Sequence, residues 1–318
     1  MTPSSTASTP SPRLSLTLGL GCYIIWGFFP LYFIQLSPAG SLEVIVHRAV
    51  WGLISCLIFL TILGRLPELK ALIRNKKAIL YLSISGILIV LNWTFYVFAI
   101  QSGRTLDAAL GYYINPLMTV AVGMIILRER ISFFQKIALF FGAAAVVVMV
   151  VGMGSLPWIS LILPTSFTLY SLAKKQVAKM AGAIEGMTIE TAAVTPILLG
   201  YYAYLALNEA TSFHTINATN THTSWPIHLL WLIGSGFLTV LCLCLFAQAS
   251  KGLSLGVLGF IQYVGPSLQM IIAVLIFHEH VEPGRWVATA LVWVALFFLT
   301  AEWALKALRA RRKYADQQ

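Results

Sequence analysis

LGYYINPLMTVAVGMIILRER at residues 110–130 and LGFIQYVGPSLQMIIAVLIFHEH at residues 258–280 are two copies of one pattern. A shift of 150 residues aligns three residues of the first copy with three of the second, without a gap: Tyr113 with Tyr263, Pro116 with Pro266, and Glu129 with Glu279. A weaker match, at a shift of 144 residues, sets Trp26-Gly27 against Tyr170-Ser171. The chain therefore contains an internal repeat, which decides how its elements are grouped.

The sequence around both copies is too apolar for a soluble domain. Of the 318 residues, 58% are hydrophobic and only 10% are charged, whereas soluble domains carry about 25% charged residues. A run of about 20 apolar residues is long enough to cross a bilayer as a helix. Ten such runs are present: 14–34, 42–63, 78–100, 105–127, 132–152, 156–173, 186–207, 228–250, 254–277 and 284–304. The sequence thus predicts an all-α polytopic membrane protein with ten transmembrane helices.

The basic residues indicate how these helices are oriented, because cytoplasmic loops carry an excess of Lys and Arg. With the N-terminus in the cytoplasm, 18 of the 21 basic residues fall in cytoplasmic segments. Only Arg104 and Arg285 fall outside, and Arg48 lies within a span. We therefore expect both termini to be cytoplasmic, and the net charge of +10 to reflect topology and not nucleic-acid binding. The long external loop at 208–226 has no Lys or Arg and is expected to be a solvated linker.

The two stretches belong to two halves of the chain, and each half holds five spans. Because five is an odd number, the second half must enter the membrane in the opposite direction. The fold predicted is two inverted five-helix repeats, an arrangement typical of secondary transporters, whose substrate sites lie at midplane between the halves. The predicted division of the chain is a cytoplasmic tail at 1–13, a first repeat at 14–152, a second repeat at 153–304 and a basic cytoplasmic tail at 305–318.

His278-Glu279-His280 looks like a set of metal ligands, but the repeat argues otherwise. The equivalent stretch of the first copy is Arg128-Glu129-Arg130, so the element that the copies share is a Glu at a helix end. Histidine replaces arginine on the side of the membrane where positive charge is disfavoured. We therefore expect no metal site here.

The repeated prolines predict a pair of kinks near the centre of the membrane. Pro116 lies about ten residues into its span, which is about 15 Å deep at about 1.5 Å per residue, and Pro266 reaches a similar depth from the other side. A proline frees the carbonyl four residues before it, here those of Tyr112 and Gln262. Such a carbonyl cannot face lipid, so it must face protein or a water-filled cavity. Five residues are expected to contribute to a substrate site there: Tyr112, Tyr113, Asn115, Gln262 and Tyr263. The alternative is a kink that serves helix packing and binds no substrate.

Other polar and aromatic residues fall within the spans. Glu43 and His47 lie on one helical face with Trp51, and Arg48 is one residue off that face. They form either a polar wall of a transport pathway, titratable through Glu43 and His47, or a structural cluster near the outer surface. Glu190 lies near the inner end of its span, where a structural and a functional role are equally open; Lys174, Lys175 or Lys179 could pair with it. Four more polar or aromatic residues lie within spans: Trp26, Asn92, Trp93 and Tyr96. They either line a cavity that binds amphipathic molecules or pack in the membrane core.

Several kinds of chemistry have no motif in the chain. There is no phosphate-binding G-x-x-x-x-G-K-[ST], no G-x-S-x-G nucleophile elbow and no H-E-x-x-H. The four cysteines lie inside apolar runs without metal-ligand spacing. We therefore expect no cofactor and no enzymatic activity.

Four stretches resemble one known family: YIIWGFFPLYF at 23–33, EVIVHRAVW at 43–51, NWTFYVFA at 92–99 and LGYYINPL at 110–117. They are similar to the RarD branch of the EamA-like group in the drug/metabolite transporter superfamily. The similarity covers approximately residues 14–304, and family members commonly have Glu where this chain has Asp107. The resemblance implies a bacterial inner-membrane protein that moves small organic molecules, with the lipid bilayer and a small-molecule substrate as its partners.

The leading hypothesis is therefore a secondary transporter, an exporter of small metabolites or drugs that alternates access around a midplane cavity. Two alternatives stand beside it: an intramembrane enzyme acting on lipid, with Glu43 and His47 as its reactive pair, and a non-transporting membrane sensor or scaffold. The absence of a nucleophile argues against the first alternative, and the short loops argue against the second.

Overall fold

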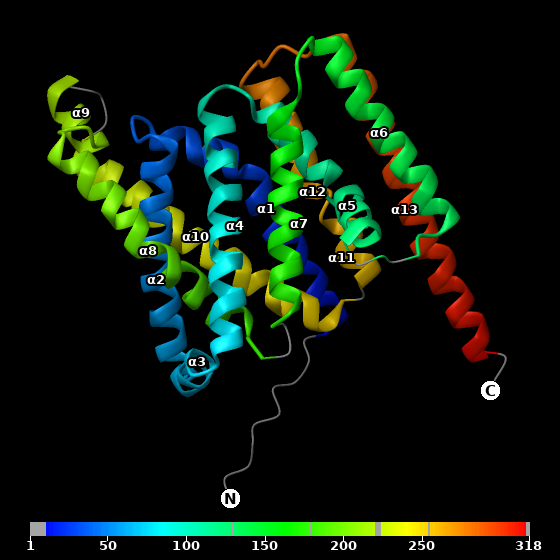
Figure 1. The fold of residues 1–318 in the computed structure, drawn as a ribbon, viewed down its shortest axis with the longest axis horizontal. Coiled ribbons are helices and arrows are strands. Elements are labelled where there is room, and N and C mark those ends of the chain that lie inside the picture. Colours follow the sequence, from blue (N-terminus) through cyan, green and yellow to red (C-terminus); the bar gives the residue numbers. More distant parts are fainter. Residues whose placement is uncertain are drawn as a thin grey trace, which may run out of the picture.

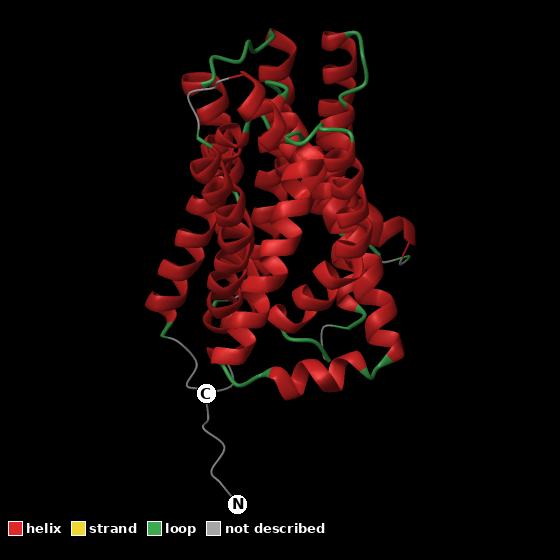
Figure 2. Ribbon diagram, turned by 90° about the vertical axis from the view of Figure 1, so that its left-hand side faces the viewer, coloured by secondary structure: helices red, strands yellow, loops and turns green. Residues whose placement is uncertain are grey.

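The computed structural model describes residues 11–126, 128, 130–177, 180–219, 224–253 and 255–315, and every regular element within them is a helix. Nine helices have 18 or more residues: α1 (Pro12–Phe33), α2 (Ser41–Ile62), α4 (Lys76–Gln101), α5 (Thr105–Ile126), α6 (Phe133–Met153), α7 (Trp158–Lys175), α8 (Ala183–Leu207), α10 (Trp225–Gly252) and α13 (Pro283–Ala315). They run side by side, and α1 begins at the end of the bundle where α13 finishes (Figures 1 and 2).

Eight helical stretches among the described residues are long and apolar enough to cross a membrane: Pro12–Leu36, Ser41–Ile62, Lys76–Gln101, Thr105–Ile126, Phe133–Gly152, Trp225–Gly252, Val257–Ile276 and Pro283–Glu302. Each coincides with an expected span to within a few residues. The other two expected spans, 156–173 and 186–207, are also helical, as α7 and α8, but they are not among the eight. The chain is thus a multi-pass membrane protein.

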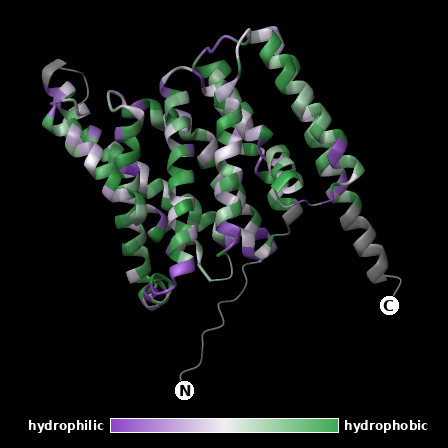
Figure 3. Ribbon diagram, viewed as in Figure 1, coloured by the Kyte–Doolittle hydropathy of each residue, from purple (hydrophilic) through white to green (hydrophobic). Residues whose placement is uncertain are grey.

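The outer surface of the bundle is what a bilayer requires. Large apolar side chains point outward along the helices, with Ile125 and Phe140 both 70% exposed and Phe297 65% exposed. Hydrophobic residues extend along the helices, and hydrophilic ones gather near their ends and on the short helix α3 (Figure 3). A soluble monomer rarely exposes so much contiguous apolar surface, so this face is suited to lipid.

Helix ends follow local sequence signals. α6 starts with a capping box, in which Ser132 and Gln135 each bond the backbone N–H of the other. α4 starts at Asn75, whose side chain accepts from the N–H of Ala78. α6 stops at Gly154, whose φ of +62° is a conformation that glycine adopts without strain. These caps place the loops at the two ends of the bundle.

Two short helices differ from the sequence expectation. α3 (Leu66–Ile73) was not predicted; it buries Leu69 and Leu72 and lies at the lower end of the bundle in Figure 1. α9 (Ser212–Thr219) occupies the segment predicted to be a solvated linker, and that prediction is wrong at its start, because Ser212 is only 1% exposed. Its burial follows from a buried carboxylate partner, described below.

The helices that carry the two repeated prolines differ in continuity. The second copy breaks at Gln262 and Tyr263, between α11 (Leu255–Ile261) and α12 (Val264–Ile271), one turn before Pro266. A π-helical turn, Ile272–Ile276, follows directly. In the first copy, Pro116 lies inside α5, which is uninterrupted. Since a proline is tolerated within the first turn of a helix, Pro266 suits the start of α12. The two copies therefore differ in helix continuity, and a kink within α5 at Pro116 stays a prediction.

Candidate functional site

A buried arginine forms the centre of the polar interior. Arg48 on α2 is 4% exposed, and its guanidinium lies over the ring of Trp93, 4.1 Å from the ring centre. The rings of Phe33 and Phe29 lie 5.3 and 5.8 Å away. Nε donates to the hydroxyl of Thr239 on α10, at 2.8 Å. The cation is therefore held by aromatic faces and one hydroxyl.

Three further residues predicted for the site surround this arginine. Asn92 on α4 donates through Nδ2 to the carbonyl of Leu163 (2.9 Å) and to Ser166 (3.0 Å), both on α7. Its Oδ1 lies 3.4 Å from the hydroxyl of Tyr112. The ring of Tyr112 meets that of Tyr96 edge-on at 5.5 Å, and both tyrosines are within electrostatic range of the guanidinium. Four predicted residues, Asn92, Trp93, Tyr96 and Tyr112, thus share one environment with Arg48.

Tyr113 belongs to a different cluster, because consecutive residues of a helix point about 100° apart. Its hydroxyl bonds Ser267 on α12 at 2.6 Å, and its ring stacks on Tyr263 with centres 6.3 Å apart. Trp293 on α13 adds an edge contact. This tyrosine cluster joins α5 to α12 and α13.

The remaining predicted residues are not brought together with either group. Trp26 on α1 contacts the rings of Tyr23 and Phe246, and its carbonyl accepts from Gln269 at 3.1 Å. Asn115 lies 3.5 Å from the hydroxyl of Thr168 on α7. Gln262 is half-buried at the break before α12. The nine predicted substrate-binding residues therefore occupy several neighbouring environments and not one shell.

No hydrogen bond or ion pair joins Glu43 to His47 among the described residues, although the helical spacing places them on one face. The Glu43 carboxylate accepts from the backbone N–H of Ser212 (3.0 Å) and from its hydroxyl (2.8 Å), at the start of α9. His228 on α10 completes this group, 2.9 Å from the same hydroxyl. His47 packs against Tyr202 and Phe213. Glu43 thus anchors α9, which explains the burial of Ser212.

Glu190 has the partner that its burial requires. Lys174 on α7 approaches it at 3.0 Å, and Ser85 on α4 donates to it at 2.7 Å. Lys175 is exposed, and Lys179 lies outside the described residues. Arg65 and Glu185 form a second ion pair nearby in the chain, at 2.8 Å.

Lys174→Met is expected to lower the free energy of unfolding by about 1–3 kcal/mol, because the buried Glu190 carboxylate loses its charged partner. Lys175→Met removes the same charge one residue further, at an exposed position, and should have no measurable effect. Thermal unfolding of both variants in detergent compares them directly. Equal melting temperatures for the two variants would contradict the assigned pairing.

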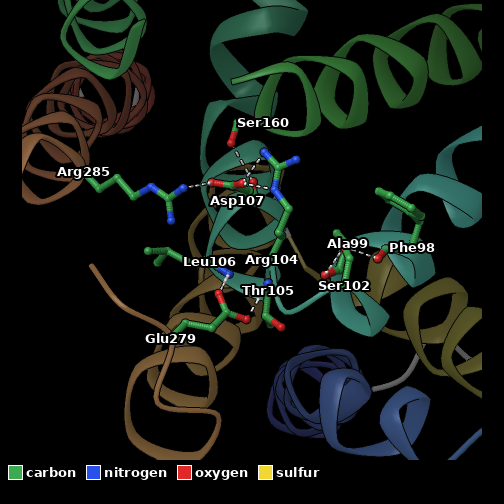
Figure 4. Close-up of polar contacts among 10 residues, drawn as sticks. All are labelled: Phe98, Ala99, Ser102, Arg104, Thr105, Leu106, Asp107, Ser160, Glu279 and Arg285. Atoms are coloured by element: carbon green, nitrogen blue, oxygen red, sulfur yellow. Dashed lines mark hydrogen bonds and ion pairs between the residues drawn. The ribbon is translucent and has the colours of Figure 1, made fainter. Parts of the chain in front are cut away.

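A charged cluster at one end of the bundle was missed by the sequence reading (Figure 4). Asp107, fully buried on α5, pairs with Arg104 at 2.8 Å and with Arg285 of α13 at 3.4 Å. Ser160 of α7 donates to the backbone carbonyl of Asp107 at 2.8 Å. Figure 4 shows that side chains from distant segments of the chain meet here. We name this group the Asp107 cluster.

Glu279 caps α5 beside the Asp107 cluster. Its two carboxylate oxygens accept from the backbone N–H groups of Thr105 (2.6 Å) and Leu106 (2.8 Å). A carboxylate at a helix N-terminus satisfies free N–H groups and complements the helix dipole. The repeat had marked Glu279 as a shared helix-end residue, but only the fold reveals which helix it caps. Its sequence counterpart, Glu129, lies outside the described residues.

These features define a class of protein. The described residues form a multi-pass helical bundle with an apolar outer face, and its interior holds a buried cation, polar side chains and aromatic rings. No group of His, Cys, Asp or Glu in the described part of the chain could hold a metal ion. Such an interior, with polar groups buried at membrane depth, is typical of proteins that pass solutes through the bilayer.

Comparison with known proteins agrees with this class. Residues 13–151 match the EamA-like transporter family. The RarD protein of Streptomyces exfoliatus is 34% identical, over 95% of this chain and 92% of its own, and that of Escherichia coli K12 is 34% identical, over 89% and 93%. An uncharacterised transporter of Pseudomonas aeruginosa is 36% identical, over 91% and 94%. The chain belongs to the EamA-like transporter family, in its RarD-like branch.

A solved crystal structure supports the same architecture. It superimposes with a TM-score of 0.54 over 92% of this chain and 98% of that one, at 16% sequence identity. At that identity the likeness concerns the fold alone.

Proposed function

We propose that this protein is a secondary transporter that exports small organic molecules across a bacterial inner membrane. It alternates access between two inverted five-helix repeats, residues 14–152 and 153–304. The observation that carries the proposal is the symmetry of the helix contacts. Neither a lipid-modifying enzyme nor a sensor needs such symmetry, whereas alternating access uses it directly.

Helices of the first half find equivalents in the second when the ten segments are matched in order: α1 with α7, α2 with α8, α4 with α10, α5 with α11–α12, and α6 with α13. The contact of α4 with α7 then corresponds to that of α10 with α1. Likewise α5 with α7 corresponds to α12 with α1, and α2 with α10 to α8 with α4. Three further contacts each join a helix to its own equivalent in the other half: α2 with α8, α5 with α12 and α6 with α13. This pairing supports counting α7 and α8 as spans.

Single residues repeat the same correspondence. Ser85-Gly86 on α4 and Ser235-Gly236 on α10 are 150 residues apart, the shift found in the sequence. Each serine donates to the carbonyl three residues before it. Each glycine touches the backbone of the equivalent partner helix: Gly86 meets α8 at Glu190, and Gly236 meets α2 at Gly52. Two-fold equivalence at this level favours a duplicated unit.

Alternating access would open one end of the bundle while the other stays closed. The Asp107 cluster and the Glu279 cap close the end nearer Arg104. We take this end as the outer one, because cytoplasmic loops are expected to carry most of the Lys and Arg residues. The two ion pairs of Glu185 and Glu190 lie toward the opposite, cytoplasmic end. Substrate would bind between them, along the residues around Arg48 and around the tyrosine cluster.

Tyr113→Ala and Asn115→Ala are expected to abolish transport, because both residues lie beside the Pro116 segment, at the proposed midplane site. Only Asn115→Ala is expected to leave the yield of folded protein unchanged, since Tyr113 is buried among three helices. Purified protein in liposomes, assayed for exchange of radiolabelled organic solutes, measures this. Tyr204→Phe, at a residue that is 62% exposed, is the matched control. Wild-type rates in both alanine variants would remove these residues from the site. Failure of wild-type protein to move any solute, with turnover of lipid instead, would overturn the transporter proposal.

A further inference from the structure

Two polar atoms in the core around Arg48 have no bonding partner. Nη1 of Arg48 and the hydroxyl of Tyr96 are both buried and make no hydrogen bond within the described part of the chain. Buried polar atoms nearly always have a hydrogen-bond partner in native proteins, because a buried atom without one loses its hydrogen bonds to water and gains none in exchange. The two residues are neighbours, because the ring of Phe33 lies under the guanidinium and also meets the ring of Tyr96 at 6.0 Å.

Arg48 also has no counter-ion among the described side chains. Among the residues whose side chains the structure describes, ion pairs join Asp107, Glu185 and Glu190 to their cations. Arg48 takes part in none of them, and it is the one Lys or Arg among the buried charged residues of the described chain. A buried cation without an anion is costly in a membrane interior and is usually retained for function.

The aromatic rings explain only part of this burial. Cation–π contact with Trp93 stabilises the face of the guanidinium. The N–H groups of a guanidinium lie in its plane and point away from a stacked ring, so they still require acceptors. Thr239 accepts from Nε alone. The edge bearing Nη1 has no acceptor among the described residues.

The place of this edge suits a solute-binding site. Arg48 is seven residues from the start of α2 and Tyr96 five residues from the end of α4. At about 1.5 Å per residue both lie roughly 8–10 Å inside the bundle from the same end. The site is therefore within the membrane but reachable from one end once that end opens.

We propose that Arg48 and Tyr96 bind the carboxylate of a small organic monocarboxylate, with the rings of Phe29, Phe33 and Trp93 beside its apolar body. This inference rests on the proposed transporter function and names its substrate class. A guanidinium presents its donors in a fork that matches a carboxylate, and the Tyr96 hydroxyl adds a third donor. A single buried cation balances a monoanion, whereas a phosphate dianion would leave a charge uncompensated. A cationic solute would be repelled.

The test compares matched ligands on the purified full-length protein. The panel pairs aliphatic, aryl and amino acids with their primary amides, from acetate to indole-3-acetate, and the shift in melting temperature reports binding to the native state. We expect at least one acid to stabilise the wild type while its amide does not. Stabilisation by the amides alone, by amines alone, by acid and amide equally, or by no acid at all would overturn the assignment.

Variants then place the carboxylate. Arg48→Lys keeps the charge but loses the fork, and it should raise the Kd of the acid by roughly 30-fold or more. Tyr96→Phe removes only the unbonded hydroxyl, so it should fold as the wild type does and raise the Kd by about tenfold. Tyr204→Phe is the matched hydroxyl deletion at an exposed site and should leave the Kd unchanged. Unchanged acid affinity in folded Tyr96→Phe and Arg48→Lys would sink the proposal.

Transport in liposomes separates this inference from the broader function. Acid binding that depends on Arg48, without transport of any solute, would uphold the site and overturn the transporter proposal. Transport of neutral or cationic solutes that is indifferent to Arg48→Lys would uphold the transporter and overturn the carboxylate site.

Discussion

Gly236→Ala is expected to lower the stability of the protein by about 3 kcal/mol or more, the upper range for overpacking a core. A Cβ atom at Gly236 would lie 2.4 Å from the backbone nitrogen of Gly52 and 2.6 Å from the carbonyl carbon of Trp51. Backbone atoms cannot rotate away as a side chain can, so α10 and α2 must separate. Their separation would also disturb Thr239, which holds Arg48. Gly86→Ala should behave alike, because its Cβ would lie 2.5 Å from the carbonyl oxygen of Glu190.

Gly200→Ala is the matched control for these variants. Gly200 lies within α8, and a Cβ there would meet no atom within 4 Å. Alanine favours a helix over glycine by up to about 1 kcal/mol, so this variant should be neutral or slightly stabilising. Melting temperature in detergent and the monodisperse fraction on size exclusion measure all three. Equal behaviour of Gly236→Ala and Gly200→Ala would refute close backbone packing of α2 and α10.

Asp107→Asn is expected to destabilise the Asp107 cluster by about 3 kcal/mol, because removing one partner of a buried ion pair leaves the other uncompensated. Arg104 and Arg285 would then face each other with their common carboxylate lost. Since these residues join α5 to α13, the same change should loosen that end of the bundle. Thr105 is fully buried beside the cluster, so a cysteine placed there reports the opening.

Maleimide labelling of Thr105→Cys is expected to be slow alone and about tenfold faster or more when combined with Asp107→Asn. Glu279→Gln should act in the same direction, because a neutral amide accepts less strongly from the N–H groups of α5. Glu209→Gln, at an exposed position, is the control. Labelling rates that do not change in Asp107→Asn would show that the cluster does not hold this end closed.

How much of the fold can be predicted from the sequence depends on which physical constraint sets each feature. Apolar runs predicted the membrane helices to within a few residues, because a bilayer fixes their length. The position of the break at Gln262 was harder to predict, because a proline favours a kink but does not determine at which turn the helix is interrupted. α9 was misread because polar composition suggests solvent, and only tertiary contact reveals that the Glu43 carboxylate binds its first residue.

For the candidate site, the sequence indicated residue types better than it indicated their geometry. Asn92, Trp93, Tyr96 and Tyr112 were selected as polar or aromatic residues within spans, and they do meet, around Arg48. Tyr112 and Tyr113 were expected together but face different helices, which follows from their spacing once the neighbours are known. Asp107 gave no signal beyond its charge near a helix start, because its partner Arg285 lies 178 residues away in the chain.

The cap that Glu279 provides has a consequence for how such a chain could be divided. In a fragment ending near Met153, the backbone N–H groups of Thr105 and Leu106 at the start of α5 would lack their hydrogen-bond acceptor, because Glu279 belongs to the other half. Under the proposed inverted arrangement, only a second copy inserted upside down could offer Glu129 in its place. Two separate chains of the first half would then have to insert into the membrane in opposite orientations. Arg128 and Arg130, which flank Glu129, disfavour the orientation that places them outside. The fused chain avoids that conflict, because the second half carries histidines at those positions and can keep one fixed orientation.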